Sequence, residues 1–183
     1  KIADLSVDLI YGLPDETMEQ WQKTLHDVLQ LQPQHISCYG LKLEEGTPLA
    51  ERPETLHLPS DDDVADMYLA AVERLAEEGY AQYEISNFAK NGKRSFHNTR
   101  YWLDDEYIGI GPSAHSFMEG RRFYCGRSIK DFLEKPFSEN ETEESSGGGW
   151  EEVAMLRLRL TDGLDVFELA EKFPEVNAEE ILE

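Results

Sequence analysis

The sequence predicts an α/β protein in which strands and helices alternate along the chain. Short apolar runs at residues 5–10, 35–41 and 83–85 are typical of strands, and turn residues bound them. Two amphipathic stretches lie between these runs. The runs are almost continuously apolar, which is typical of parallel strands that helices cover. Because the order favours parallel strands joined by right-handed crossovers, we expect the second half of a βα barrel or part of an open sheet.

The first amphipathic stretch predicts a helix that ends before Pro33. Asp15 or Thr17 can cap its first turn with a side-chain oxygen. Pro33 ends it, because the residue before a proline avoids the helical backbone conformation. The apolar residues at helical spacing are Met18, Trp21, Leu25, Val28 and Leu29.

The second amphipathic stretch predicts a helix that begins after Ser60. Residues 61–63 are three aspartates, which the positive end of the helix dipole favours in the first turn. Gly79 stands where a glycine commonly ends a helix. The stripe expected to be buried consists of Val64, Met67, Tyr68, Ala71 and Leu75.

The C-terminal part has a different composition. Residues 138–149 (SENETEESSGGG) are acidic and rich in serine and glycine, which is typical of a linker. Amphipathic patterns at 151–160 and 165–173 predict two helices of a small helical domain. The expected division is therefore 1–137, 138–149 and 150–183.

Composition limits the functions that are plausible. The chain has 183 residues with 17 basic and 38 acidic ones, so its formal net charge is −21. This charge repels nucleic acid phosphates and anionic lipid, so we expect no nucleic acid partner. No apolar run approaches the length of a membrane span. Lys1 begins the chain without a methionine and Glu183 ends it within a helical pattern, so we expect a piece of a longer protein.

Two cysteines, Cys38 and Cys125, are too few for a disulfide framework. We expect free thiols in a reducing cytoplasm. Their spacing matches no zinc or iron–sulfur motif.

Asp8 lies within the first apolar run, where an unpaired carboxylate is costly. In a βα barrel, functional groups gather at the carboxyl ends of the strands. A carboxylate there suits the two hydroxyls of a ribose. The alternative is a structural aspartate bonded to the neighbouring backbone.

The stretch SFHNTRYWLDDEYIGIGPSAHSF at 95–117 combines histidines, aromatic rings and glycines. His97 could bind haem iron or zinc, and Asn98 could orient its imidazole. Tyr101 and Trp102 could pack on a flat macrocycle. The alternative is a buried hairpin whose histidine is satisfied locally beside core aromatics, and composition alone favours it.

The run GIGPSAH at 109–115 has only weak likeness to a phosphate-binding loop. It lacks the third glycine of a dinucleotide fingerprint and the lysine of a P-loop. Its glycines could instead let the backbone approach a ligand or another strand closely. His115 and Ser116 lack a third orienting group, so they predict no catalytic pair.

Four motifs in this order resemble one family. They are DLIYGLP at 8–14, EISNFAK at 84–90, HNTRYW at 97–102 and GIGPSAHSF at 109–117. Together they resemble the radical S-adenosylmethionine, coproporphyrinogen III oxidase-like proteins, and HNxxYW resembles the haem-chaperone (HemW) branch. The resemblance implies a partial (β/α)6 barrel with a 4Fe–4S cluster and S-adenosylmethionine, followed by a small helical domain.

The same resemblance implies roles for individual residues. Asp8 matches the aspartate that contacts the ribose of S-adenosylmethionine, and the backbone at Ala114 and His115 matches a contact to its adenosyl part. His97 matches a metal ligand for haem iron. The remaining residues of the haem-associated motif are Asn98, Tyr101 and Trp102.

The chain departs from the family in lacking CxxxCxxC, so we expect it to hold no cluster by itself. The resemblance implies a cytoplasmic haem chaperone that delivers haem to haem proteins, membrane enzymes among them. The alternative is an oxygen-independent coproporphyrinogen III oxidase. A half barrel would also expose a strand edge, so we expect possible self-association.

Overall fold

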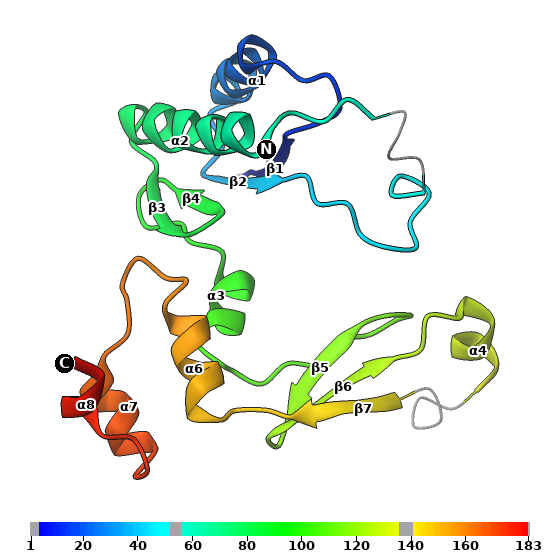
Figure 1. The fold of residues 1–183 in the computed structure, drawn as a ribbon, viewed down its shortest axis with the longest axis vertical. Helices are drawn as coiled ribbons and strands as arrows, with labels where there is room; N and C mark the ends of the chain where they lie inside the picture. The colour runs from blue at the N-terminus through cyan, green and yellow to red at the C-terminus, as the bar shows by residue number, and fades with distance from the viewer. Residues whose placement is uncertain (1–3, 52–55, 136–140, 183) are drawn as a thin grey trace. The chain divides into compact units, whose positions relative to one another are not determined.

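The computed structural model describes residues 4–51, 56–135 and 141–182. The chain divides into two units, Lys1–Ser95 and Phe96–Glu183 (Figure 1). This boundary lies well before the expected one at residue 137. In the first unit the elements are β1 (Ser6–Tyr11), α1 (Met18–Gln30), β2 (His35–Gly40), α2 (Asp61–Glu77), β3 (Ala81–Glu84) and β4 (Asn87–Ala89).

The first unit contains a four-stranded mixed sheet in the order β1-β2-β4-β3. β1 and β2 are parallel, as expected, and α1 connects them. β4 pairs antiparallel with both β2 and β3. β3 therefore runs in the same direction as β2, and β4 lies between them. The link between β3 and β4 is too short for a crossover helix, so β4 turns back and fills that position.

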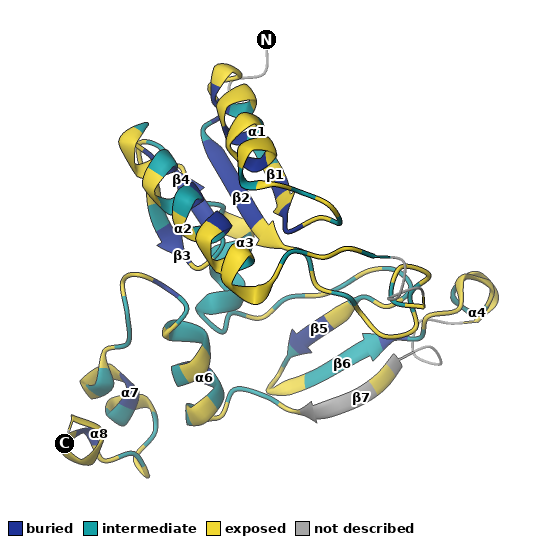
Figure 2. Ribbon diagram, turned by 45° about the horizontal axis from the view of Figure 1, so that its top comes forward, coloured by how far each residue is buried: buried dark blue, intermediate teal, exposed yellow. Residues whose placement is uncertain are grey.

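The core lies between the sheet and the two helices, which cover one face (Figures 1 and 2). Trp21 is fully buried at its centre, and its Nε1 donates to the Met67 carbonyl at 2.8 Å. The sheet contributes Leu9, Tyr11, Ile36, Cys38 and Phe88, and the helices contribute Leu25, Leu29, Met67, Ala71 and Leu75.

Both predicted helix starts are confirmed. Thr17, one of the two candidates, caps α1 in a capping box with Gln20. Ser60 caps α2 in the same way with Asp63. Gly79 follows α2 with φ +79°, a left-handed conformation that glycine adopts without strain.

The other face of the sheet is polar. In β1, Leu9 and Tyr11 are buried, whereas Ser6, Asp8 and Ile10 are exposed. The helices α1 and α2, which cover the sheet as expected, both pack on one face. Asp8 lies on the opposite face, where its carboxylate reaches solvent without the cost of burial.

A chain of hydrogen bonds crosses this polar face at His35. Its Nδ1 lies 2.9 Å from the Ser6 hydroxyl and its Nε2 2.8 Å from the Tyr83 hydroxyl. Tyr83 also accepts from the Ser95 amide at 3.1 Å. Burial lowers the pKa of His35 although Asp8 opposes the shift, and burial raises the pKa of Tyr83 to about 12. His35 is therefore a neutral structural residue.

The second unit contains a three-stranded antiparallel sheet and short helices. Residues 96–102 form a helix, so the hairpin that composition favours for 95–117 is wrong at its start. The elements are α3 (Phe96–Trp102), β5 (His115–Met118), β6 (Arg121–Cys125), α4 (Ile129–Glu134), β7 (Glu141–Ser146), α6 (Trp150–Arg157), α7 (Val166–Lys172) and α8 (Ala178–Leu182).

The acidic stretch expected to be a linker contains a strand. Glu141–Ser146 is β7, which pairs antiparallel with β6. Strand pairing is made by backbone groups, so a polar composition does not prevent it. Residues 138–140 lie outside the described part of the chain. The two predicted C-terminal helices are confirmed as α6 and α7, with slightly shorter bounds. In the described ranges, no helix is long and apolar enough to cross a bilayer.

Replacing His35 with glutamine should flatten the pH dependence of unfolding. Because the folded state lowers the pKa of His35, protonation favours the unfolded state, and stability contributed by His35 is lost as the pH falls below about 6.5. Urea unfolding at pH 7.5 and 5.5, followed by tryptophan fluorescence, measures the difference. His26→Gln on the exposed face of α1 is the control. Equal pH dependence in the wild type and His35→Gln would contradict the prediction.

Candidate functional site

The helix α3 carries all four residues of the HNTRYW motif that the sequence analysis selected. Residues four apart lie on the same face of a helix, so His97 and Tyr101 meet. The Tyr101 hydroxyl lies 2.8 Å from His97 Nε2, and the two rings pack edge to face with centroids 4.9 Å apart. His97 is exposed, whereas Tyr101 is half-buried. The motif spacing therefore produces a hydrogen-bonded imidazole–phenol pair.

A cavity of about 340 Å³ lies beside this pair in the second unit. The side chains that line it are Tyr101, Trp102, Tyr107, Arg122, Glu152 and Leu156. Two of the predicted residues, Tyr101 and Trp102, thus share one cavity. His97 and Asn98 are not among the described residues that line it; His97 reaches it only through Tyr101.

Tyr107 forms the opposite aromatic wall. Its ring meets the Tyr101 ring edge to face, with centroids 4.6 Å apart. Its backbone exchanges two hydrogen bonds of 2.9 Å with Phe117 on β5, which fix its position. Its hydroxyl accepts from Arg122 Nη1 at 3.4 Å. Sequence reasoning missed Tyr107, although an aromatic residue a few positions after the motif was a signal.

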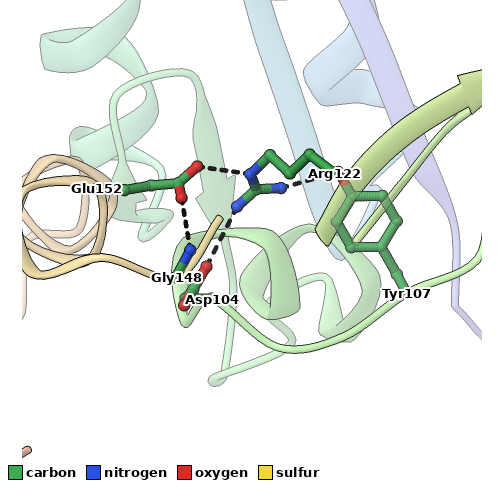
Figure 3. Close-up of polar contacts among 5 residues, drawn as sticks. All are labelled: Asp104, Tyr107, Arg122, Gly148 and Glu152. Atoms are coloured by element: carbon green, nitrogen blue, oxygen red, sulfur yellow. Dashed lines mark hydrogen bonds and ion pairs between the residues drawn. The ribbon is translucent and has the colours of Figure 1, made fainter. Parts of the chain in front are cut away.

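Arg122 on β6 holds the charged wall of the cavity together (Figure 3). Its Nε donates to Glu152 at 2.6 Å and its Nη2 to Asp104 at 3.2 Å. The second oxygen of Glu152 accepts from the Gly148 amide at 2.8 Å. The guanidinium also lies over the Phe117 ring at 4.3 Å. One side chain thus connects the loop after α3, the sheet and α6.

This wall contains more negatively charged groups than positively charged ones. Burial and the neighbouring Glu152 raise the pKa of Asp104 more than Lys172 and Arg122 lower it. One guanidinium faces two carboxylates, so the cluster of Asp104, Arg122 and Glu152 is net negative when all are ionised. A ligand carboxylate is therefore disfavoured at this wall. An apolar ring edge carries no charge and is not repelled.

Trp102 packs against a second arginine. The Arg159 guanidinium lies over its indole ring at 4.3 Å. The indole Nε1 is buried and has no hydrogen-bond partner among the described residues. An indole N–H usually finds a partner when it is buried, so this donor is an unsatisfied buried polar group.

The glycine-rich loop has a structural explanation. A Cβ on Gly109 would lie 2.2 Å from the His115 carbonyl oxygen, so only glycine permits this approach of two backbone segments. The Gly109 amide donates to the Ser116 hydroxyl at 3.0 Å. The Ala114 amide and carbonyl both bond within the unit, to Gly111 and Cys125. His115 is exposed and stacks on Tyr124 with centroids 5.2 Å apart.

Asp8 belongs to the first unit and heads a polar row across its sheet. The strand register aligns Asp8 with Ser37, Ser37 with Asn87, and Asn87 with Glu84. Ser37, Asn87 and Glu84 are buried. The Glu84 carboxylate accepts from the Ser86 backbone amide at 3.0 Å and from the side-chain amide of Asn87. The sequence showed EISN as a motif but not this alignment, which depends on the position of β4.

The cysteines do not fit an iron–sulfur cluster. Cys38 lies in the core of the first unit, and burial raises the pKa of its thiol to about 12. Cys125 is buried in the second unit. No group of three potential metal-binding side chains occurs within residues 4–51, 56–135 and 141–182.

Comparisons with known proteins place these features in a family. No protein-family model matches the chain. "Heme chaperone HemW" of Bacillus subtilis is 34% identical over 93% of this chain and 47% of its own length. The protein of the same name from Lactococcus lactis is 37% identical, over 93% of this chain and 46% of its own length. The mitochondrial "Radical S-adenosyl methionine domain-containing protein 1" of Danio rerio is 45% identical over 61% of this chain and 26% of its own length.

A solved structure has a similar fold. Coproporphyrinogen III oxidase (HemN) from Escherichia coli, a radical SAM enzyme, matches 99% of this chain and 46% of its own chain, with a TM-score of 0.75. At 20% identity this likeness concerns the fold alone. The chain spans about half the length of the curated relatives it matches. By its sequence, this chain belongs to the radical S-adenosylmethionine, coproporphyrinogen III oxidase-like family that includes the haem chaperones.

Proposed function

We propose that this chain is the haem-binding part of a radical S-adenosylmethionine haem chaperone, which binds haem and passes it to haem proteins. The observation that carries the proposal is that Tyr101 and Trp102 of one motif helix line the same cavity, beside the His97–Tyr101 pair. The relatives named as haem chaperones support it.

The chemistry of the cavity suits a porphyrin edge. Tyr101, Trp102 and Tyr107 offer aromatic faces and edges that pack on a flat apolar ring. Imidazole and phenolate are both known axial ligands of haem iron. The cavity volume of about 340 Å³ lies at the lower end of ligand pockets. A macrocycle would therefore be held at one edge and stay accessible to a protein that receives it.

We further propose that the first unit is the C-terminal half of a partial (β/α)6 barrel and that α6–α8 begin a small helical domain. The parallel β1–α1–β2 unit supports the barrel. Among the described strands, β1 has one neighbour in its sheet, so its other edge could pair with a preceding strand or a second copy. The polar, open face on which Asp8 lies would then face the barrel interior.

In a full-length protein that carries this chain, Asp8 would hold the ribose hydroxyls of S-adenosylmethionine. Its exposed carboxylate fits this role. The backbone of Ala114 and His115 would contact the adenosyl part. Because the Ala114 amide and carbonyl both already bond within the unit, Ala114 would do so through the second lone pair of its carbonyl oxygen. Radical cleavage of this cofactor needs a 4Fe–4S cluster, for which the described residues supply no ligands. We therefore derive no radical step for this chain.

A second candidate function is oxygen-independent oxidation of coproporphyrinogen III. Likeness in fold to the Escherichia coli enzyme supports it. The haem-chaperone relatives, which are more similar in sequence, support the first candidate. Turnover of coproporphyrinogen by the full-length protein, with no haem bound, would favour the enzyme.

Haemin should bind this chain, and binding should shift the Soret band of the haemin. The Trp102→Leu substitution should weaken this binding. Loss of ring packing in the cavity costs on the order of 1–2 kcal/mol, or roughly tenfold in affinity. Titration followed at the Soret band measures the change. Trp150→Leu is the matched control, because Trp150 does not line the cavity. Equal losses in the two variants, with circular dichroism unchanged, would contradict the assigned cavity.

Asp8→Asn should weaken S-adenosylmethionine binding by the full-length protein. A hydrogen bond to a charged group contributes about 1.5–3 kcal/mol, which corresponds to roughly ten- to hundredfold in affinity. Equilibrium dialysis with labelled cofactor gives the dissociation constants. Asp27→Asn on α1 should leave them unchanged. An Asp8→Asn protein with wild-type affinity would refute the ribose contact.

A further inference from the structure

Resting on the proposed haem-binding function, we propose that Tyr101, rather than His97, coordinates ferric haem iron, and that His97 positions the phenol and accepts its proton. The motif alone points to the imidazole, because histidine is the commoner haem ligand. The geometry of α3 distinguishes the two side chains.

The first argument is which side chain reaches the cavity. Tyr101 lines it together with Trp102 and Tyr107. His97 is exposed and is not among the described lining residues. A macrocycle packed in this cavity would therefore contact the Tyr101 side chain, which packs edge to face on His97 and on Tyr107.

The second argument is the hydrogen bond itself. His97 Nε2 lies 2.8 Å from the Tyr101 hydroxyl, so this nitrogen is already engaged. With the imidazole proton on Nδ1, Nε2 accepts from the phenol O–H. Coordination then forms the Fe–O bond and breaks the O–H bond, and the proton moves to Nε2. The iron stays ferric and no electron is transferred. The product is an iron-bound phenolate hydrogen-bonded to an imidazolium.

The third argument comes from the other phenol of the cavity. Tyr107 packs on Tyr101 and is similarly placed in the lining. Its described hydroxyl contact is with Arg122, a donor that accepts no proton. Arg122 is also held by Asp104 and Glu152, so this wall is fixed and acidic. Tyr101, by contrast, is in hydrogen-bond contact with the His97 imidazole.

The test uses ferric haemin with the wild-type chain, Tyr101→Phe, His97→Gln and the matched control Tyr107→Phe. Phenylalanine preserves the ring packing in both tyrosine positions. We expect the wild-type complex to show a phenolate-to-iron charge-transfer band, with phenolate modes in resonance Raman spectra. Tyr101→Phe should abolish these signals and weaken binding at least about tenfold. Tyr107→Phe and His97→Gln should keep the band, His97→Gln with weaker binding.

The results of this experiment distinguish a wrong iron ligand from the absence of haem binding. A wild-type complex with an imidazole-type low-spin spectrum that persists in Tyr101→Phe and disappears in His97→Gln would overturn the assignment and leave haem binding intact. A phenolate band that disappears in Tyr107→Phe but not in Tyr101→Phe would also overturn it. Absence of any Soret shift with the wild-type chain would instead refute the haem-binding function.

Discussion

One-sided burial of the first sheet is the constraint on which the first unit depends. α1 and α2 both pack on the face that carries Leu9, Ile36 and Phe88, and Trp21 fills the space between them. Because side chains alternate along a strand, burial of these residues leaves Ser6, Asp8 and Ser37 on the opposite face. The position of the Asp8 carboxylate is thus a consequence of where the helices pack. A one-residue slip of β1 would bury Asp8 and expose Leu9.

In the second unit, an ionic cluster joins segments that are far apart in the sequence. Arg122 joins Asp104, Glu152 and the Tyr107 hydroxyl, which come from three different segments (Figure 3). Removal of a guanidinium from between two carboxylates that are largely shielded from water would leave uncompensated charge. The cluster therefore fixes one wall of the cavity, while its excess of carboxylates keeps ligand anions away from that wall.

The side-chain contacts of the HNTRYW motif depend on its helical conformation. HNTRYW would mean little in an extended chain, where residues four apart do not face each other. In α3, His97 and Tyr101 are in hydrogen-bond contact. Trp102 lines the same cavity as Tyr101. Under the proposed function, the chain must hold haem and also release it. The proposed axial ligand, whose proton can return from a neighbouring base, is compatible with both demands.

The local structure of the first unit and the family could be predicted from the sequence alone. The capping residues Thr17 and Ser60, the apolar stripes of α1 and α2, and the strands at β1 and β2 follow from short-range rules. The motifs selected His97, Tyr101 and Trp102. The remaining features could not be predicted, because they depend on contacts between distant segments. The insertion of β4 beside β2, the pairing of the acidic β7 with β6 and the Arg122 cluster are of this kind, since long-range backbone pairing and ion pairs leave no periodic pattern in the sequence.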